Sequence, residues 1–383
     1  MFQLFRNRRR YRRPYGRGHA LRPVIKYAIA AFATPFIASA AYLYWVSVTP
    51  LSPEPKIYVV QPGTTLRGFA HQLYDEKVLP DAHTLVWLAY LKGQGRDLKA
   101  GEYRFRKGVT PMELLDQVVN GRVVEYPFTI VEGWNFKQVM QSLDAAPRLT
   151  HTLQGMPPQK IMASLGYPGM SPEGRFYPDT YYYSAGMSDL LVLQRAFQKM
   201  DVTLQKEWAS RDSSVPLKTP EQALTLASIV EKESSKPEER SIIAGVFANR
   251  LRLGMRLQTD PTVIYGMGDR YHGKITFRDL TRPTPYNTYV IHGLPPTPIA
   301  MPSEDSLHAA LNPADTKALY FVSRGDGTHV FSDNLADHNR AVIKYQLKGK
   351  PLPQASAEHL AYAKSKPHHR RQVHRRRTGE ANK

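Results

Sequence analysis

The sequence contains no cysteine, which excludes a disulfide framework and any cysteine-ligated zinc or iron–sulfur centre. Because a cysteine-free chain folds in either redox compartment, this absence does not locate the protein. Acidic residues are nearly missing from both ends: residues 1–26 contain nine Lys or Arg and no acid, and residues 364–383 contain eight together with Glu380. These tails carry most of the formal charge of +19, so the chain between them is close to neutral.

Apolar residues are plentiful between the tails, and 42% of the 383 residues are hydrophobic. A chain of this length and composition predicts two or three domains of roughly 100–200 residues each and excludes wholesale disorder. The tails have low complexity and no apolar periodicity, so we expect both to be disordered. Their Arg-rich runs could bind nucleic-acid phosphates, but the membrane topology argued next removes the C-terminal tail from nucleic acid and gives the N-terminal run another role. The sequence therefore predicts no nucleic-acid partner.

A long apolar run lies near the N-terminus, and no charged residue occurs from Tyr27 to Pro53. A membrane-crossing helix needs about 20 apolar residues, so residues 25–48 are predicted to span a bilayer behind a basic tail at 1–24. Lipid-embedded helices tolerate a proline such as Pro35, and rings near the end of the run are typical of a membrane interface: Tyr42, Tyr44 and Trp45. The one-sided basic flank predicts a cytoplasmic N-terminus, with everything after the helix outside. A cleavable signal peptide and a buried core helix are the alternatives, which the lengths of the basic and apolar stretches disfavour.

Residues 57–121 predict a small α+β module after this anchor. A short strand enters the Pro62-Gly63 turn, and a helix follows over 66–74. The pattern repeats with a strand at 103–106 and a helix that starts after residue 110. The opening YVVQPGTTLRGFA resembles a LysM module, which implies binding to polymers that contain N-acetylglucosamine. The alternative is a packing module that holds the rest of the chain away from the membrane.

The stretch TPEQALTLASIVEKESS at 219–235 has a clear helix start, in which Thr219 is the N-cap, a proline follows, and Gln222 completes a capping box. At about 100° per residue, the apolar side chains form one broad face: Ala223, Leu226, Ala227, Ile229 and Val230. Glu233 and Glu231 lie on opposite borders of that face. A carboxyl there, near a helix C-terminus, has a raised pKa because desolvation and the helix dipole both disfavour the anion. Glycosidic cleavage needs such a proton-carrying carboxyl, although periodicity alone describes either glutamate as a solvated surface residue.

The helix at 219–235 is one of several sequence motifs that carry a family resemblance: ASIVEKES, RLRLGMRLQTDPTVIYG, YNTYVIHGLPPTPIAMPS, TIVEGW, EGRFYPDTYYY and YFVSRGDGTHVFS. Together they resemble the endolytic murein transglycosylase family (MltG or YceG-like). The resemblance runs from the anchor to Leu347, and the Arg/His-rich tail beyond residue 364 departs from it. It implies an α+β catalytic domain over 125–347.

The resemblance also implies a chemistry. Lytic transglycosylases use one glutamic acid on a helix, usually followed by Ser or Thr, and in ASIVEKES that residue is Glu233. Glu233 is therefore the predicted catalytic residue, with Glu231 as the alternative. It would protonate the oxygen between N-acetylmuramic acid and N-acetylglucosamine and then accept the proton of the muramoyl C6 hydroxyl, which closes on C1 to give a 1,6-anhydro end. One carboxylate would replace the two of ordinary glycoside hydrolases, and no metal or cofactor is predicted.

Further residues are candidates for substrate binding, because amide, hydroxyl, carboxylate and aromatic groups line sugar clefts: Ser234, Gln258, Thr259, Asp260, Tyr265, Tyr286 and Asn287. Ser234 could equally bond backbone, and Asp260 could be a plain turn or cap. Glu173 and Asp179 are candidate second carboxylates, or structural residues. The histidines show no metal-ligand spacing.

Three functions follow from these observations. The first is a membrane-anchored endolytic lytic transglycosylase that terminates nascent glycan strands; the second is a non-catalytic anchored wall-binding protein; the third is a two-carboxylate muramidase-type hydrolase. The resemblance favours the first and implies a single-pass protein of the bacterial cytoplasmic (inner) membrane with its catalytic domain in the periplasm. It implies peptidoglycan glycan strands as substrate and peptidoglycan synthases (penicillin-binding proteins) as partners. The predicted fold is α+β, with strands in the larger domain at 126–131, 320–323 and 328–332.

Overall fold

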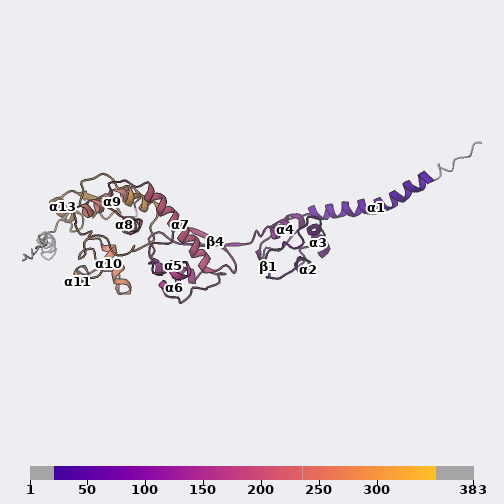
Figure 1. The fold of residues 1–383 in the computed structure, drawn as a ribbon, viewed down its shortest axis with the longest axis horizontal. Helices are drawn as coiled ribbons and strands as arrows, with labels where there is room; N and C mark the ends of the chain where they lie inside the picture. Colours follow the sequence, from indigo (N-terminus) through magenta and orange to yellow (C-terminus); the bar gives the residue numbers. More distant parts are fainter. Residues whose placement is uncertain (1–20, 235, 351–383) are drawn as a thin grey trace, which may run out of the picture. The chain divides into compact units, whose positions relative to one another are not determined.

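The computed structural model describes residues 21–234 and 236–350 (Figure 1). The C-terminal tail at 364–383 and most of the N-terminal tail at 1–24 lie outside these residues, so their expected disorder stays a prediction. The described chain mixes helices with short two-stranded sheets.

The chain divides into two compact units. The first reaches Tyr126 and includes Tyr182–Met187, and the second comprises Pro127–Tyr181 and the residues from Ser188 onward. Each unit has its own cluster of buried apolar side chains. They are described one at a time below.

The first unit begins with α1 (Leu21–Val48), which contains Pro35. Among the described helices, one segment is long and apolar enough to cross a membrane: Lys26–Val48, with a mean hydropathy of 1.5 and almost no buried surface. At its C-terminal end Val46 and Ser47 are buried, because α1 packs against α3 and α4 there. The predicted span therefore coincides with an apolar helix whose last turn is held by the first unit.

The rest of the first unit consists of a strand, two helices, a second strand and a third helix: β1 (Tyr58–Val60), α2 (Leu66–Asp75), α3 (Ala82–Leu91), β2 (Gly101–Tyr103) and α4 (Pro111–Val119). β1 and β2 are antiparallel, with Tyr58 opposite Tyr103. The predicted strand at 103–106 is wrong in position, because the pairing with β1 ends at Tyr103. Helix α3 was not predicted, since AHTLVWLAYL is apolar on nearly every side and shows no amphipathic period.

Local signals in the sequence explain the two amphipathic helices of this unit. The Thr65 side chain accepts from the Gly68 N–H and caps α2. Thr110 and Glu113 form a reciprocal capping box at the start of α4. The inner faces of α2 and α4 fill the core of the unit, together with both strand tyrosines: Phe69, Leu73, Leu114, Leu115, Tyr58 and Tyr103.

Five elements follow α4 along the chain: β3 (Glu125–Thr129), α5 (Phe136–Asp144), α6 (Pro158–Ser164), β4 (Thr180–Ser184) and α7 (Asp189–Ala209). The strands β3 and β4 each contain residues of both units, and the three helices belong to the second unit. β3 pairs with β4 in a two-stranded sheet. The predicted strand at 126–131 overlaps β3 but extends two residues too far, because the chain turns before α5. Asn135 caps α5 through a reciprocal capping box with Gln138.

Helix α8 (Pro220–Glu233) is the central helix of this unit. It packs against α7, α9 (Pro237–Arg252), α10 (Asp260–Met267) and α12 (Glu304–Leu311). All residues from Ala223 to Val230 are buried, so the expectation of one apolar face was too narrow. The helix can be buried all round because its polar side chains are satisfied: Thr225 Oγ1 donates to Glu221 O at 2.8 Å, and Ser228 Oγ donates to Thr225 O at 2.7 Å.

The N-terminus of α8 confirms the predicted capping box in part. The Thr219 side chain accepts from the Gln222 N–H, as predicted. The Gln222 side chain, however, accepts from the Lys218 N–H at 2.7 Å rather than from the Thr219 N–H. The predicted capping box is therefore wrong in its second half, because the side chain reaches one residue further back.

The chain ends its described part with η1 (Gly268–Arg270), α11 (Phe277–Thr281), α12, β5 (Tyr320–Ser323), β6 (His329–Ser332) and α13 (Leu335–Tyr345). β5 and β6 are antiparallel, with Phe321 opposite Phe331, and they lie where strands were predicted at 320–323 and 328–332. Helix α13 packs against both strands. This hairpin and α13 form one side of the groove described next.

Candidate active site

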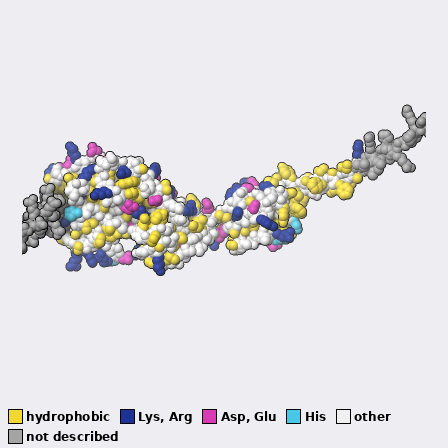
Figure 2. Space-filling model, viewed as in Figure 1, with side chains coloured by type: hydrophobic (Ala, Val, Ile, Leu, Met, Phe, Trp, Pro, Cys, Tyr) yellow, Lys and Arg dark blue, Asp and Glu magenta, His cyan; other side chains and the backbone are white. Residues whose placement is uncertain are grey.

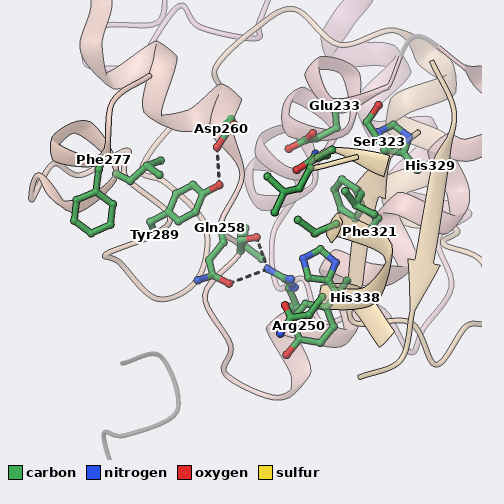
Figure 3. Close-up of a pocket in the computed structure, with 18 residues that line it drawn as sticks. Glu233, Arg250, Gln258, Asp260, Phe277, Tyr289, Phe321, Ser323, His329 and His338 are labelled. Carbon is green, nitrogen blue, oxygen red and sulfur yellow. Dashed lines mark hydrogen bonds between the residues drawn. The ribbon is translucent and has the colours of Figure 1, made fainter. Parts of the chain in front are cut away.

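A groove of about 550 Å³ opens in the second unit at the C-terminal end of α8 (Figure 3). Residues 257–260, α11 and Tyr289 form one side, and β5, β6 and α13 form the other. Figure 3 shows labelled side chains on the two sides of this space, with Asp260, Tyr289 and Gln258 on one side and Glu233, Phe321 and His338 on the other. Glu233, the last residue of α8, lines this groove.

Glu233 is held by one hydrogen bond from a neighbouring segment. Its Oε1 accepts from the hydroxyl of Thr259. Within the described parts of the chain, no hydrogen bond to its Oε2 occurs. The residue is partly exposed at the groove, so a ligand in the groove can reach the second oxygen.

The protein around Glu233 favours its protonated form. Burial raises the pKa of Glu233 from its ordinary value of 4.5 to about 7. The hydrogen bond from Thr259 acts in the opposite direction, the negative charge of Asp260 raises the pKa further, and the charges of His329 and Arg250 lower it. The result is a carboxyl that is close to half-protonated at neutral pH, as a group that both gives and takes a proton requires.

A cluster of threonines fixes the hydroxyl that contacts Glu233. Thr259 is buried, and its N–H donates to Thr288 Oγ1 at 3.0 Å. Thr262 Oγ1 donates to Thr259 O at 2.8 Å and lies 2.8 Å from Thr288 Oγ1. The preceding residue, Gln258, has φ of 51°, a left-handed conformation that costs about 1–2 kcal/mol outside glycine. The segment that carries Thr259 is therefore positioned by buried hydrogen bonds and some backbone strain.

Asp260 and Gln258 also line the groove. Asp260 Oδ1 accepts from the Tyr289 hydroxyl at 2.6 Å. Burial, and then the charge of Asp260, raise the pKa of Tyr289, so this phenol stays a hydrogen-bond donor. Gln258 Oε1 accepts from Arg250 Nη1 at 3.4 Å. Three of the predicted substrate-binding residues, Gln258, Thr259 and Asp260, thus lie at or next to the candidate acid.

Two basic side chains from other elements flank the groove. Arg250 on α9 is buried and donates to Leu319 O at 2.6 Å and to Leu257 O at 2.7 Å. His329 on β6 contacts Glu239 Oε2 through Nδ1 at 2.6 Å. Both side chains line the groove, where the charge of Arg250 stabilises the Glu233 anion.

Glu231 occupies a different environment on the other side of α8. Its Oε2 accepts from the Ser303 N–H at 2.9 Å, from Ser303 Oγ at 2.5 Å and from Ser306 Oγ at 2.7 Å. Its Oε1 pairs with Arg240 at 3.3 Å, and the two side chains are 6% and 8% exposed. Glu231 does not line the groove, so its carboxylate joins α8 to α9 and α12.

The remaining substrate-binding candidates lie away from the groove lining. Ser234 is buried, accepts from the Lys236 N–H and donates to Lys236 O, so its hydroxyl shapes the turn after α8. Asn287 is also buried, and its Nδ2 donates to three carbonyls of the α11 segment. Both residues hold backbone in place and do not line the groove, and their contact with substrate stays a prediction.

Tyr265 and Tyr286 pack against each other with ring centroids 4.8 Å apart. Tyr265 donates to Glu173 Oε2 at 3.0 Å, and Tyr286 bonds Thr297. Glu173 and Tyr265 line a separate pocket of about 550 Å³. Neither tyrosine lines the groove that holds Glu233, and their role in substrate binding stays a prediction.

The two candidate second carboxylates also lie outside the groove lining. Glu173 accepts from the Phe136 N–H at 3.0 Å, and burial raises its pKa to about 7. Asp179 accepts from Lys199 Nζ at 2.5 Å, a contact that lowers its pKa. The acid that does line the groove with Glu233 is Asp260.

Metal binding finds no support in the described side chains. Residues 21–234 and 236–350 contain no group of three or more His, Cys, Asp or Glu side chains arranged to hold a metal ion. The absence of a metal or cofactor stays a prediction.

Several groove residues were missed by sequence reasoning: Arg250, Tyr289, Tyr320, His329 and His338. They come from five segments between α9 and α13, and their sequence spacing carries no periodic signal. Only the fold brings them together.

The fold and the groove define a class: a mixed helix–strand protein with one proton-carrying carboxyl at the end of a core helix, suited to acid–base chemistry on a ligand held in an open groove. The YceG-like family model matches residues 58–344. The chain therefore belongs to the YceG-like family.

Known relatives agree with this assignment. The chain is 28% identical over 330 residues to the endolytic murein transglycosylase of Bacillus subtilis, a match that covers 81% of this chain and 91% of the relative. It is 27% identical over 343 residues to the endolytic murein transglycosylase of Streptococcus pneumoniae, covering 78% of this chain and 60% of that longer protein. A solved structure of a YceG-like protein from Listeria monocytogenes is 29% identical, with a TM-score of 0.49, and the match covers 76% of this chain and all of that one.

Proposed function

We propose that this chain is a membrane-anchored endolytic lytic transglycosylase that cleaves peptidoglycan glycan strands between N-acetylmuramic acid and N-acetylglucosamine. The observation that carries the proposal is the Glu233 carboxyl, which has a pKa of about 7 and lines an open groove. The family membership and the names of the curated relatives support the same activity.

Glu233 acts twice in the proposed reaction. As the acid, it protonates the glycosidic oxygen while the bond from that oxygen to C1 of the muramoyl residue breaks. The resulting carboxylate then takes the proton of the muramoyl C6 hydroxyl, whose oxygen bonds to C1. The products are a 1,6-anhydromuramoyl end and a free hydroxyl on the departing sugar, and the carboxyl is protonated again at the end of the cycle.

The surroundings of Glu233 fit both roles. Burial and the charge of Asp260 favour the protonated form that starts the reaction, whereas Thr259, His329 and Arg250 favour the carboxylate that completes it. Thr259 bonds Oε1, which fixes the carboxyl and leaves Oε2 for proton transfer. Asp260, Tyr289 and Gln258 are polar groups along the groove that can bind sugar hydroxyls and amides.

The anchor and the first unit complete the proposal. The segment Lys26–Val48 spans the cytoplasmic membrane with its basic flank inside, and the chain after this segment lies on the outer side. After α1, the first unit continues with the strand, turn and helix that resemble a LysM module, and we propose that this part binds glycan. Peptidoglycan synthases are the proposed partners, because a tethered cutter that terminates nascent strands must meet them where they are made.

The experiment uses the full chain in detergent micelles, purified glycan strands and mass spectrometry of the products. Anhydro ends, each one water lighter than a reducing end, support the proposal. Reducing ends would instead identify a hydrolase, for which Asp260 is the second acid in the groove lining, and unchanged strands would indicate a wall-binding protein. Glu233→Gln is the matched variant and should leave the strands intact.

A further inference from the structure

A second groove, of about 1120 Å³, lies in the first unit between α1 and α3. The lining from α1 comes from its C-terminal half, residues 36–47, and is apolar or aromatic apart from two serines: Phe36, Ala38, Ser39, Ala40, Tyr42, Leu43, Tyr44 and Ser47. The lining from α3 includes Trp87, Leu88 and Leu91. Apart from Asp81, which caps α3 through Thr84, the lining carries no carboxylate or basic side chain other than His83. The groove is therefore mostly apolar.

The position of α3 beside α1 is fixed by the first unit. Val46 and Ser47 are buried, and the segment after α1 is tied to the loop before α4 by two backbone hydrogen bonds of 2.8 Å. In these bonds the Leu51 N–H donates to Val109 O and the Gly108 N–H donates to Leu51 O. Since α1 continues directly into a packed unit, α3 must occupy the same depth in a membrane as the part of α1 that it lies beside.

That depth can be derived from the length of α1. Residues that line the groove with α3 begin at Phe36, and Lys26 is the last charged residue before the apolar run. The stretch between them measures about 15 Å at ~1.5 Å per residue, half of the ~30 Å hydrocarbon core. If α1 left the bilayer before reaching α3, it could not span it. A spanning α1 therefore carries α3 into the outer part of the bilayer.

The chemistry of α3 suits this location. Its sequence, AHTLVWLAYL, contains no Lys, Arg, Asp or Glu. Trp87, Tyr90 and Leu91 are 57%, 65% and 72% exposed, an apolar and aromatic face that water would not favour. Tryptophan and tyrosine are enriched at membrane interfaces, and α1 carries the same ring types at the corresponding depth in Tyr44 and Trp45. Figure 2 shows the hydrophobic surface of α1 continuing to where the helix joins the first unit.

Basic groups lie next to this face. A pocket between α2 and α3 is lined by Arg67 and His71 together with Val86, Trp87 and Tyr90. The exposed Lys92 follows α3 directly. Long basic side chains beside an apolar face reach toward lipid phosphates while the face stays in the hydrocarbon.

We propose that α3 is a second membrane contact, a short interfacial helix whose Trp87, Tyr90 and Leu91 insert into the outer leaflet beside α1. The proposal rests on the anchor of the proposed function. The first unit then contacts the membrane through α3 as well as through α1, and is not held to the membrane by α1 alone.

The test measures the depth of single tryptophans in the full chain reconstituted in nanodiscs. The chain has four tryptophans: Trp45, Trp87, Trp134 and Trp208. Three variants each keep one of them and carry Trp→Phe at the others, so that the emission comes from Trp45, Trp87 or Trp208. Each is measured with lipids brominated on the acyl chains, which quench on contact, and with aqueous acrylamide.

The proposal expects Trp87 to lose fluorescence to brominated lipid to an extent similar to Trp45, while Trp208 in the second unit keeps it. Quenching of Trp45 without quenching of Trp87 overturns the proposal and leaves the anchor intact. If Trp87 is protected from both acrylamide and brominated lipid, another protein surface covers the groove, which also overturns the proposal. If neither Trp45 nor Trp87 is quenched by lipid, the anchor itself is wrong.

Discussion

Two glutamates that lie two residues apart on α8 have very different hydrogen-bond partners. Glu231 accepts from two serines and pairs with Arg240, so both of its oxygens are occupied. Glu233 accepts one hydrogen bond, from Thr259, and lines a groove. On helical spacing alone the two are equivalent border positions. The difference is made by what packs around the helix end: a buried carboxylate with a complete set of partners stabilises the fold, and one with an incomplete set is available for chemistry.

The largest expected effect comes from the glutamate with few partners. Glu233→Gln removes the transferable proton but keeps the shape of the side chain. We expect kcat to fall by about 10²–10⁴-fold, the usual contribution of a general acid–base group. Release of anhydro ends from glycan strands measures the rate. The thermal midpoint of this variant at pH 5 should match that of the unaltered chain, and a variant that retained full activity would contradict the assignment.

Glu231→Gln should lower the stability of the fold and leave the activity of the folded protein unchanged. It leaves Arg240 buried without its close carboxylate, which costs about 3 kcal/mol of unfolding free energy. Denaturant unfolding measures this loss, and activity per folded molecule should be retained. The matched control is Asp305→Asn, because Asp305 also contacts Arg240 but is 73% exposed and should cost about 0.5 kcal/mol or less. Loss of activity in Glu231→Gln with an unchanged unfolding free energy would transfer the catalytic role to Glu231.

A smaller effect is expected from removing the Thr259 hydroxyl, which donates a hydrogen bond to Glu233. Thr259→Val removes the hydrogen bond to Glu233 at nearly constant volume, so the pKa of Glu233 should rise and kcat should fall about tenfold, the equivalent of one hydrogen bond. The pH dependence of kcat/KM measures the shift as a displacement of its alkaline limb to higher pH. Thr259→Ser keeps the hydroxyl and should restore the limb. An unchanged limb in Thr259→Val would show that Thr259 does not act on Glu233.

A last expected effect is on stability as a function of pH. The pKa of Glu233 is raised from 4.5 to about 7 in the folded state, so between these values the folded chain holds more protons than the unfolded chain. The contribution of Glu233 is therefore fully present below pH 4.5 and is lost as the pH rises through about 7. Glu233→Gln should remove this slope, because glutamine does not titrate. The unfolding free energies of the two proteins, compared at several pH values from 4.5 to 8, measure the difference; equal slopes would contradict it.

Local signals in the sequence predicted local structure well. The apolar span, the N-cap of α8 and the strands β5 and β6 follow from composition, capping chemistry and alternation over a few residues. The sequence also indicated Gln258, Thr259 and Asp260, because they lie together in one string that matches the family. These features depend on interactions between residues that are close along the chain.

Features that depend on tertiary packing were not predictable in the same way. Helix α3 lacks an amphipathic period because it faces protein on one side and, as we propose, lipid on the other. The burial of α8 on all sides depends on four neighbouring helices. Tyr265 and Asn287 have the chemistry of sugar-binding residues but lie where their polar groups bond Glu173 and backbone carbonyls. The type of a side chain shows which hydrogen bonds it can form, but the tertiary structure decides which groups lie close enough to form them.

The protonation state of Glu233 is the central claim and can be measured directly. Carbon-13 NMR of the full chain in detergent, labelled at glutamate side-chain carboxyls, gives a titration curve for the resonance that disappears in Glu233→Gln. The account predicts a midpoint of about 7 for that resonance. A midpoint at the ordinary value of 4.5 would mean that the group is ionised at neutral pH and is not the proton donor.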